Sequence, residues 1–447
     1  MKILQYTLGL PPYRRGGLPR YSTDLSTELA RDNEVVLLYP GRIPFKSSLE
    51  LKFVLQESSY PFQVVEMLNP LPVSLGLGIK NSAPYMIKRK KENICTFLKT
   101  LNPDIIHIHT LMGLPIEFLE VAKELNIKTI YTTHDFYGLC PKMLTSNPKK
   151  LLKSRSCSFD CMLCKDGPSI KKIQVMQSKI YMYLKNTLLM KKIRQKQKGK
   201  IVDSPDTQNE ELLSLREVTD RYELRMYYMR MFKLIEEFHF NSSVSEKYLK
   251  KYLPNVKGKV ISITHKGIKR SKTNLINFNK NIVNIGYIGP YDKKKGFFEL
   301  IQVLNKVRGK NPNFEFHAYG DILKNDIFNK SWAKNHGIIA SNQMNKVYRN
   351  IDILVMPSLW HETFGFTVLE ALANNDVCLV SKNVGAKDLV RSECVFENQA
   401  DLKKKIICFL NNPIDRINYE KEKIISRQLP IDFSDHVNDI YQKLYLK

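Results

Sequence analysis

The sequence predicts an α/β protein with two Rossmann-like domains, and three features lead to this expectation. Short apolar runs of strand length alternate with amphipathic stretches of helical length, which is the pattern of a parallel sheet covered by helices. Glycines follow the first strand of each half, where the chain turns from strand to helix. The chain of 447 residues is long enough for two domains, and the polar run Arg270–Lys280 has the composition of a linker between them.

The first half begins with a strand at Lys2–Tyr6, a loop that contains Gly16 and Gly17, and a helix over Ser22–Arg31. The later segments repeat this alternation, which indicates parallel strands joined by helices. Further strands are expected at Val35–Tyr39, Phe62–Met67, Asp104–His109, Lys128–His134 and Val260–Thr264, and further helices at Ala83–Leu101, Pro115–Leu125 and Glu210–Phe238.

Three histidines lie near the ends of two of these strands. His107 and His109 share one strand face, and we interpret them as core or edge histidines. His134 lies at the carboxyl end of its strand and is followed by Asp135, at the position where open parallel sheets bind ligands. The sequence therefore predicts that His134 faces a binding cleft, with Asp135 as a weaker candidate beside it.

Four of the eight cysteines lie in one lysine-rich segment: Cys140, Cys157, Cys161 and Cys164. Four thiolates could hold a structural zinc ion and so order the segment. Two alternatives stay open. The thiols could be reduced and without a ligand, or they could hold an iron–sulfur cluster, because the last three have the spacing found in radical S-adenosylmethionine enzymes.

The second half repeats the alternation of strands and helices. A strand at Val283–Ile288 leads into a basic loop with Lys295 and Gly296, and a helix begins at Phe297. The chain ends with a helix over Asp432–Tyr445. Further strands are expected at Phe314–Tyr319, Gly337–Ala340, Ile351–Met356 and Cys378–Ser381.

The stretch PSLWHETFGFTVLEALA, residues 357–373, is the most informative part of the sequence. It follows a buried strand, and its helix begins close to Gly365, so the first N–H groups of the helix favour an anion such as phosphate. Glu362 and Glu370 lie eight positions apart across this turn, and the hydroxyls of a sugar nucleotide would give each carboxylate a partner. The alternative is that both are solvated acids near a helix start.

The composition is that of a folded protein with an unusual charge. Hydrophobic residues make up 43% and charged residues 26%, which excludes a mainly disordered chain. The net charge of +26 indicates phosphate-bearing substrates or an anionic membrane surface, although a lysine-rich codon bias could contribute. No nucleic-acid recognition motif accompanies the charge, so nucleic acid is not an expected partner.

The expected location follows from the same sequence. No apolar run reaches the roughly 20 residues of a membrane span, and the N-terminus lacks a secretory signal, which predicts a cytoplasmic protein. The basic amphipathic stretch over Ile170–Lys200 could lie on the inner face of the membrane or pack on the first domain, and both remain open.

The motif at 357–373 resembles the donor site of the retaining family 4 glycosyltransferases of the GT-B fold, in which two glutamates are separated by seven residues. Under this resemblance Glu362 would orient the transferred sugar, His134 would close the opposite side, and Asp135 would be a weak acceptor-side residue. Pro290 departs from the family, which often has an arginine there. The donor-binding residues that the resemblance implies are Gly16, Gly17, Lys295, Phe364, Gly365, Phe366 and Glu370.

The resemblance also implies an architecture and a reaction. The GT-B fold places two Rossmann-like domains across a central cleft, here residues 1–270 with a helical, cysteine-rich insertion at about 140–238, and residues 271–430, with 431–447 crossing back as a helix. The expected reaction transfers a sugar from a nucleotide diphosphate sugar to a polysaccharide, glycolipid or lipid-linked acceptor, with retention and without a catalytic cofactor. The alternatives are a GT-B sugar-nucleotide epimerase and an iron–sulfur radical enzyme.

Overall fold

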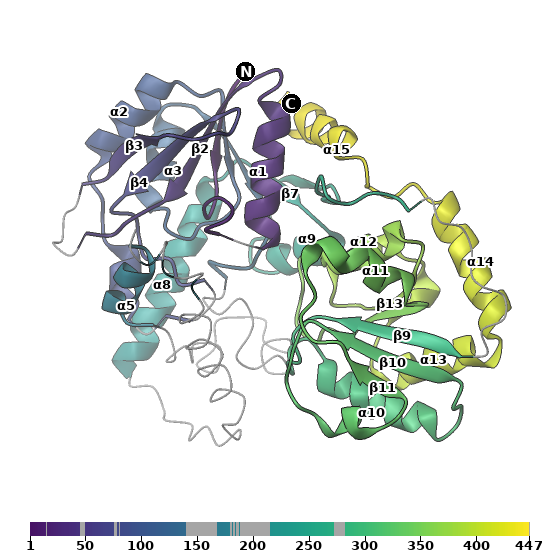
Figure 1. Cartoon of the computed structure of the whole chain (residues 1–447). Coiled ribbons are helices and arrows are strands. Elements are labelled where there is room, and N and C mark those ends of the chain that lie inside the picture. Colours follow the sequence, from purple (N-terminus) through teal and green to yellow (C-terminus); the bar gives the residue numbers. More distant parts are fainter. Residues whose placement is uncertain are drawn as a thin grey trace. The chain divides into compact units, whose positions relative to one another are not determined.

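The computed structural model describes residues 1–14, 16–44, 50–75, 78–79, 81–139, 168–178, 181, 184, 187, 215–271 and 282–446. These residues form two α/β units, each built around its own sheet (Figure 1). Unit 1 holds the described residues up to His239 together with Tyr252–Gly258, and unit 2 holds Phe240–Lys251 and the residues from Lys259 on. The predicted fold class of two α/β domains is confirmed, and the central cleft between them stays a prediction.

Unit 2 begins earlier in the chain than the expected boundary after residue 270. Helix α9 (Ser243–Lys250) accounts for part of this difference, because its first turn bonds to other residues of unit 2. The backbone N–H and the hydroxyl of Ser243 donate to the Asp388 carboxylate at 2.7 and 2.6 Å. The Ser242 hydroxyl donates to the carbonyl oxygen of Thr363 at 2.5 Å.

The sheet of the first unit has the order β3-β4-β2-β1-β5-β6-β7-β8 among the described residues. The pairs from β4 to β7 are parallel, and β3 lies antiparallel to β4. The chain moves outward from β1 on one side and from β5 on the other, so the topological switch point lies between β1 and β5. The bounds are β1 Lys2–Tyr6, β2 Glu34–Pro40, β3 Lys52–Gln56, β4 Gln63–Leu68, β5 Ile105–Ile108, β6 Lys128–Thr132, β7 Glu237–Phe240 and β8 Gly258–Val260.

One expected helix of unit 1 is divided in two. Residues 87–90 of the predicted helix over 83–101 are not helical, and a single 3-10 turn at Ala83–Met86 is separate from α2. The buried Arg89 guanidinium donates to the carbonyl oxygen of Pro70 at 3.2 Å, a tertiary contact that local periodicity does not reveal. The α-helices described in unit 1 are α1 Gly17–Leu29, α2 Lys91–Leu101, α3 Ile116–Glu124, α5 Ile170–Met176 and α8 Leu215–Leu234.

The sheet of unit 2 has the order β11-β10-β9-β12-β13-β14, and all its pairs are parallel. Its switch point therefore lies between β9 and β12. The predicted strand at 337–340 is wrong, because the edge strand ends before Gly337, which adopts a left-handed φ of 68°. The bounds are β9 Val283–Ile288, β10 Phe314–Tyr319, β11 Ala333–Asn335, β12 Ile353–Met356, β13 Val377–Ser381 and β14 Val395–Phe396.

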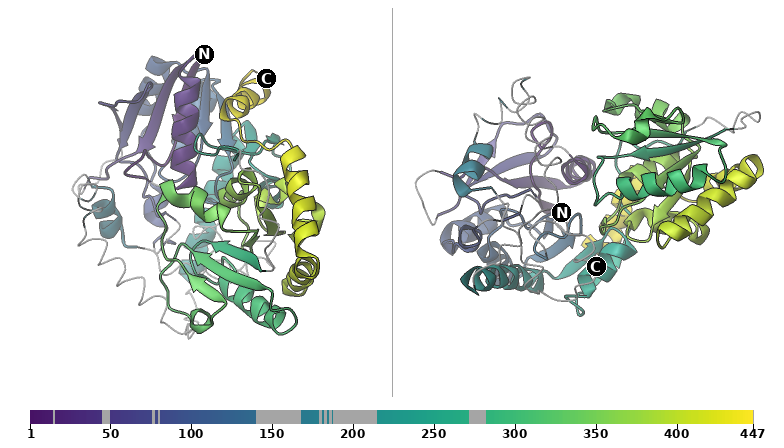
Figure 2. Two further views of the ribbon diagram at one scale, coloured as in Figure 1. Left: turned by 45° about the vertical axis from the view of Figure 1, so that its right-hand side comes forward. Right: turned by 90° about the horizontal axis from the view of Figure 1, so that it is seen from below.

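Helices cover both faces of this second sheet, as the two views in Figure 2 show. Leu300, Leu304 and Val307 of α10 recur at helical spacing and are fully buried in the core, which explains how that helix packs. The remaining bounds in unit 2 are α10 Phe297–Arg308, α11 Met344–Arg349, α12 Phe366–Ala373, α13 Gln399–Asn411, α14 Pro413–Ser426 and α15 Phe433–Ile440.

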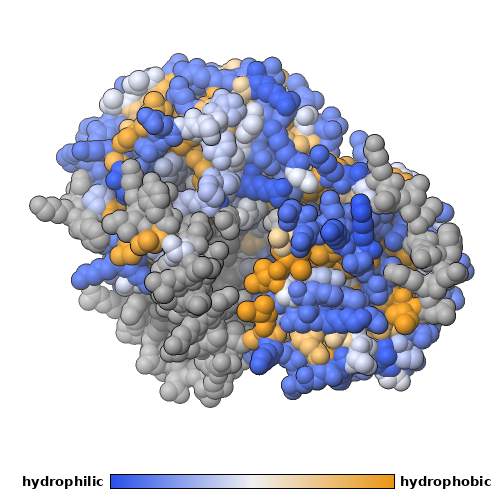
Figure 3. All heavy atoms as spheres, in the orientation of Figure 1, coloured by the Kyte–Doolittle hydropathy of each residue, from blue (hydrophilic) through white to orange (hydrophobic). Residues whose placement is uncertain are grey.

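Within the described ranges, every helix is too short or too polar to cross a membrane. Most of the described surface on the face drawn in Figure 3 is hydrophilic, with apolar residues in small groups.

Candidate functional site

Two loops leave the second sheet at its switch point, one after β9 with Lys295 and one after β12 with Glu362. The loops are bonded to each other, because the carbonyl oxygen of Lys294 accepts the backbone N–H groups of Leu359 at 2.9 Å and Trp360 at 3.3 Å. Open α/β sheets bind ligands at this position, outside the carboxyl ends of the strands. The fold thus brings two predicted site residues to one place.

Gly296 allows the two loops to approach so closely. Its φ of 72° is left-handed, which a residue with a side chain rarely adopts. A Cβ atom at this position would overlap the carbonyl oxygen of Pro357 in the other loop.

Lys295 and Glu362 form an ion pair in which Nζ lies 2.8 Å from Oε1. The same carboxylate oxygen accepts hydrogen bonds from the Ser358 hydroxyl and from the indole N–H of Trp360, the latter at 3.2 Å. The Lys295 ammonium also lies 4.7 Å from the centroid of the Trp360 ring, within cation–π range. Among the described residues no donor reaches Oε2 of Glu362, so this atom can accept a hydrogen bond from a ligand hydroxyl.

The charge on Glu362 is stabilised although its side chain is only 10% exposed. Burial acts to raise the pKa of Glu362, but the positive charge of Lys295 and the three hydrogen bonds outweigh it, so the pKa lies below its usual value. Glu362 is therefore an ionised, nearly buried carboxylate at neutral pH.

The backbone around Glu362 is held by the segment after β13. Its N–H donates to the carbonyl oxygen of Asn383 at 2.9 Å, and its own carbonyl oxygen accepts the N–H of Gly385 at 2.9 Å. The buried Phe364 follows, and its carbonyl oxygen accepts the N–H of Ala386 at 2.7 Å. These bonds fix the loop that carries the carboxylate.

Two helices begin beside this ion pair. Helix α12 follows Gly365, which has a φ of 103°, and α10 follows Gly296. Neither helix has a side-chain cap. The N–H of Phe297 in α10 donates to the carbonyl oxygen of Asp292 at 3.4 Å, and the N–H groups of the first turns that are left without a partner among the described residues favour a bound anion. The predicted donor-binding residue Phe366 is the first residue of α12.

Glu370, four residues further along α12, already has two partners. The Tyr348 hydroxyl donates to its Oε2 at 2.7 Å, and Nε2 of His265 lies 3.3 Å from its Oε1. Because Nδ1 of His265 accepts the N–H of Gly267 at 3.1 Å, Nε2 carries the proton and donates it. Sequence reasoning missed His265 and Tyr348, and no local motif marks either of them.

Pro290, which stands where the resemblance often has an arginine, lies directly after Gly289 at the end of β9. Its carbonyl oxygen accepts the hydroxyl of Tyr287 at 2.6 Å. This position therefore offers no positive side chain, and Lys295 is the cation that the structure places beside Glu362.

In unit 1 the predicted residues lie at the carboxyl ends of the strands around the switch point. Gly16, with a φ of 127°, precedes α1, and Gly17 is the first residue of that helix, which has no side-chain cap. His134 follows β6 and is partly buried, with the Tyr21 ring at 4.8 Å. Asp135 is buried and accepts the N–H of Tyr137 at 3.0 Å.

The environment of Asp135 shifts its titration. Burial is the main cause and raises the pKa of Asp135 to about 6, although hydrogen bonds from the Tyr137 N–H and the Thr110 side chain act to lower it. His107 and His109, in contrast, are fully buried, as their interpretation as core histidines requires.

The four cysteines proposed for zinc, Cys140, Cys157, Cys161 and Cys164, lie outside the described residues. Within the described part of the chain, no group of three or more His, Cys, Asp or Glu side chains is arranged to hold a metal ion.

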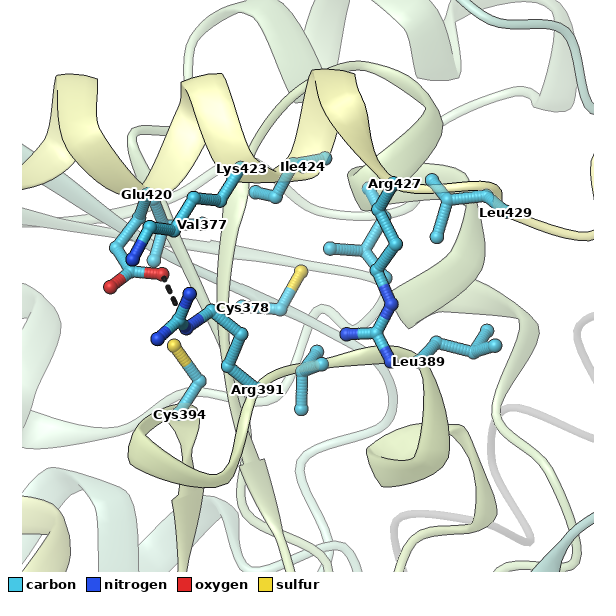
Figure 4. Close-up of a pocket in the computed structure, with 12 residues that line it drawn as sticks. Val377, Cys378, Leu389, Arg391, Cys394, Glu420, Lys423, Ile424, Arg427 and Leu429 are labelled. Atoms are coloured by element: carbon cyan, nitrogen blue, oxygen red, sulfur yellow. Dashed lines mark ion pairs between the residues drawn. The ribbon is translucent and has the colours of Figure 1, made fainter.

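A pocket with about 340 Å³ of open space lies elsewhere in unit 2, under α14 (Figure 4). Its walls include the thiols of Cys378 and Cys394, and burial raises the pKa of both. Arg391 and Glu420 also line the pocket and are paired at 3.9 Å. The pocket contains none of the predicted site residues.

Comparisons with known proteins agree with the architecture. The family model for glycosyl transferases group 1 matches residues 269–425, and that for glycosyltransferase family 4 matches residues 15–164, together more than half of the chain. An uncharacterized 42.6 kDa protein in the cps region of Klebsiella pneumoniae is 26% identical over 373 residues, which cover 81% of this chain and 76% of that protein.

Solved structures show the same fold. HepE of Anabaena in complex with UDP has a TM-score of 0.55 at 14% identity and covers 100% of both chains. Sucrose-phosphate synthase from Thermosynechococcus elongatus has a TM-score of 0.54 at 13% identity, covering 100% of this chain and 99% of its own. At these identities the likeness concerns the fold alone. Taken with the two matched family models, it shows that the chain belongs to the family 4 glycosyltransferases of the GT-B fold.

Proposed function

We propose that the protein transfers a sugar from a nucleotide diphosphate sugar to a hydroxyl of a polysaccharide, glycolipid or lipid-linked acceptor, with retention at the anomeric carbon. The similarity to cps-region proteins of Klebsiella pneumoniae supports a role in cell-surface glycan synthesis. The UDP complex of HepE, which has the same fold, supports a nucleotide-linked donor.

The observation that carries the proposal is the Lys295–Glu362 ion pair at the switch point, between the uncapped first turns of α10 and α12. The lysine and the helix N–H groups would stabilise the negative charge of a diphosphate bound there. A sugar hydroxyl would donate to Oε2 of Glu362, and a ribose hydroxyl to Glu370. Such a site matches both halves of a sugar nucleotide.

During transfer, the bond between the anomeric carbon and the diphosphate oxygen breaks, and negative charge develops on the leaving diphosphate. Lys295 and the helix N–H groups stabilise this charge, so we expect catalysis without a metal ion. Because Glu362 is held by Lys295, we expect it to orient the sugar and not to attack it. The acceptor oxygen then bonds to the anomeric carbon from the face of the leaving group, whose oxygen takes the acceptor proton.

His134, Gly16 and Gly17 belong to the proposal as contributions of unit 1. His134 would contact the transferred sugar, the glycine pair would approach the donor phosphates, and Asp135 would lie on the acceptor side. The domain limits at 1–270, 271–430 and 431–447 remain part of the same proposal.

The test measures the rate of sugar transfer by the Glu362→Ala variant. A thermal-shift screen with UDP-glucose, UDP-galactose and GDP-mannose first selects a donor, and transfer from it to a lipid-linked acceptor is then measured. We expect a loss of about 100-fold or more with a native circular dichroism spectrum. The control is Glu397→Ala in the same unit, whose side chain is 61% exposed and, among the described residues, pairs only with the surface residue Lys382. Full activity of Glu362→Ala would overturn the assignment.

Product analysis separates the alternatives. An epimerase would release isomerised sugar nucleotide without an acceptor, whereas a transferase releases nucleotide diphosphate only as acceptor is consumed. The radical-enzyme alternative has no support from the family assignment, and an iron-free active preparation would exclude it.

Two further parts of the proposal concern the membrane and zinc. A peripheral position on the inner, anionic membrane face is tested by flotation with anionic liposomes at rising salt, where absence of binding at low salt would exclude this position.

Structural zinc on Cys140, Cys157, Cys161 and Cys164 is tested by metal analysis of the purified protein. One zinc per chain, lost in Cys161→Ser, is the expected result.

A further inference from the structure

The loop between β1 and α1 carries an arginine whose charge has no counter-ion among the described residues. Nε of Arg14 is enclosed by the protein and has no hydrogen-bond partner, and the side chain as a whole is partly buried. Within the described ranges no carboxylate is among the groups that shift its pKa. Arg42, in the loop after β2, shows the usual arrangement, because its Nε lies 3.2 Å from the buried carboxylate of Glu66.

The residues around Arg14 hold its guanidinium in place. Gly9 leaves room for the side chain, since a Cβ atom there would lie 2.7 Å from Cγ of Arg14. The guanidinium carbon lies 4.8 Å from the centroid of the Tyr13 ring, and the Tyr13 hydroxyl donates to the carbonyl oxygen of Met176 at 2.9 Å. The guanidinium is therefore positioned before any ligand binds.

The contact with Tyr13 does not use the hydrogen-bonding capacity of Arg14. A cation–π contact occupies the flat face of a guanidinium, whereas its N–H groups point outward in its plane. Burial is the main cause that lowers the pKa of Arg14, so its charge is less favourable here than in water. An arginine nevertheless keeps its proton at neutral pH. A charge that is desolvated and not neutralised costs stability, and it is typical of a site that binds an ion of opposite sign.

The position of Arg14 in the fold is also that of a ligand site. Its loop leaves β1 at the switch point between β1 and β5, where open α/β sheets bind ligands. The same loop carries Gly16 and Gly17, which the proposed function places near phosphate.

We propose that Arg14 binds a phosphate group of one of the two substrates through hydrogen bonds from the terminal nitrogens of its guanidinium. The source of this phosphate rests on the proposed function, because both the donor diphosphate and the phosphate of a lipid-linked acceptor have the required chemistry. The affinity of Arg14 for phosphate is a property of the free protein and can be measured without either substrate.

The first experiment titrates the full chain, labelled with nitrogen-15 at arginine, with sodium phosphate at constant ionic strength. The Nε signals of Arg14 and of the control Arg230 are assigned by their loss in Arg14→Met and Arg230→Met. Arg230 is a matched control, because its guanidinium lies 6.0 Å from the Tyr227 ring in the same unit, but its side chain is exposed. We expect phosphate to shift the Arg14 signal and to leave the Arg230 signal unchanged. An Arg14 signal that phosphate does not move would overturn the proposal.

The melting temperature separates a ligand-binding arginine from a structural one. Without ligand, Arg14→Met should melt at the same temperature as the wild type or higher, because methionine keeps the apolar part of the side chain and removes a charge that is not neutralised. A melting temperature below those of the wild type and of Arg230→Met would show a structural role and would overturn the proposal.

Two binding measurements identify the source of the phosphate. With the donor selected above, Arg14→Met should raise by about tenfold or more either the Kd of the sugar nucleotide or the KM of a lipid-linked diphosphate acceptor, whereas Arg230→Met should change neither. A higher Kd assigns the phosphate to the donor, and a higher KM assigns it to the acceptor. If both constants equal those of the wild type, the role of Arg14 is overturned. If even the wild type transfers no sugar while phosphate still shifts the Arg14 signal, the proposed function fails and the phosphate site stands.

Discussion

Replacement of Lys295 by Met should destabilise unit 2, because it leaves Glu362 as a nearly buried carboxylate without its cation. Two unit charges about 4 Å apart attract by about 4 kcal/mol at an effective dielectric constant of about 20. Removal of one partner of a buried pair costs about 3–5 kcal/mol. Since the Lys295 side chain is 24% exposed and solvent screens part of the attraction, we expect a loss of about 3 kcal/mol, near the lower end of that range.

A double-mutant cycle separates this charge effect from lost packing. Glu362→Gln removes the charge that Lys295 balances, so in the Lys295→Met background it should recover part of the lost stability. We expect a coupling energy of about 2 kcal/mol between the two positions.

Tryptophan fluorescence during urea unfolding is the suitable assay. The only two tryptophans in the sequence are Trp332 and Trp360, and both lie in unit 2, so the signal reports that unit alone. Lys382→Met is the matched control, because Lys382 pairs with Glu397 at 2.5 Å on the surface, where the two side chains are 50% and 61% exposed. We expect that control to change stability by less than about 1 kcal/mol.

The pH dependence adds a second criterion. In the wild type the pKa of Glu362 is lower in the folded than in the unfolded protein. The ionised carboxylate therefore stabilises the fold at pH values above the pKa of the unfolded state, and this stabilisation is lost as the pH falls through the pKa of the folded state. In Lys295→Met burial should raise the pKa of Glu362, so the variant gains stability as the pH falls. The two proteins should therefore converge in acid. Additive effects in the cycle, or a difference that is constant with pH, would refute the reasoning.

Three further predictions concern other contacts of unit 2. Burial, with two nearby lysines, lowers the pKa of His361 to about 4. As the pH falls, the unfolded chain therefore binds the proton first, and the free energy of unfolding should fall by up to about 3 kcal/mol between pH of about 6.5 and 4. His361→Phe should remove this pH dependence in urea titrations, and an unchanged slope would contradict the prediction. Gly296→Ala should lower the free energy of unfolding by about 2 kcal/mol or more, because position 296 has a left-handed φ and the new methyl group would overlap Pro357. The control is Gly309→Ala, where nothing lies within 4 Å of the new methyl group. Equal melting temperatures of the two variants in calorimetry would refute the prediction. Tyr348→Phe removes the 2.7 Å hydrogen bond to Glu370 and should weaken UDP binding by about 1 kcal/mol, which is about fivefold in Kd. Titration calorimetry measures this change. An unchanged Kd would show that Glu370 does not take part in nucleotide binding.

Local patterns were sufficient for part of the architecture. Buried strands such as β9 and β12 are continuous apolar runs, and glycines follow β1 and β9, so strand, loop and helix can be recognised from neighbouring residues alone. Edge strand β3 escaped recognition because most of its residues are exposed and its sequence lacks a buried face. The strand expected at 337–340 was predicted from a short apolar run that begins at Gly337. Because Gly337 has a left-handed φ, this run does not continue strand β11.

The sequence by itself determined which residue types stand at the ends of the strands, among them Lys295, Glu362 and His134, because a strand and the turn after it are local features. Only the tertiary structure decided which of these groups meet. Lys295 and Glu362 are 67 residues apart and form an ion pair because β9 and β12 are adjacent at the switch point. Gln5 and His109 are 104 residues apart and bond because β1 and β5 are neighbours. Such contacts depend on the order of strands in the sheet, which no short stretch of sequence contains.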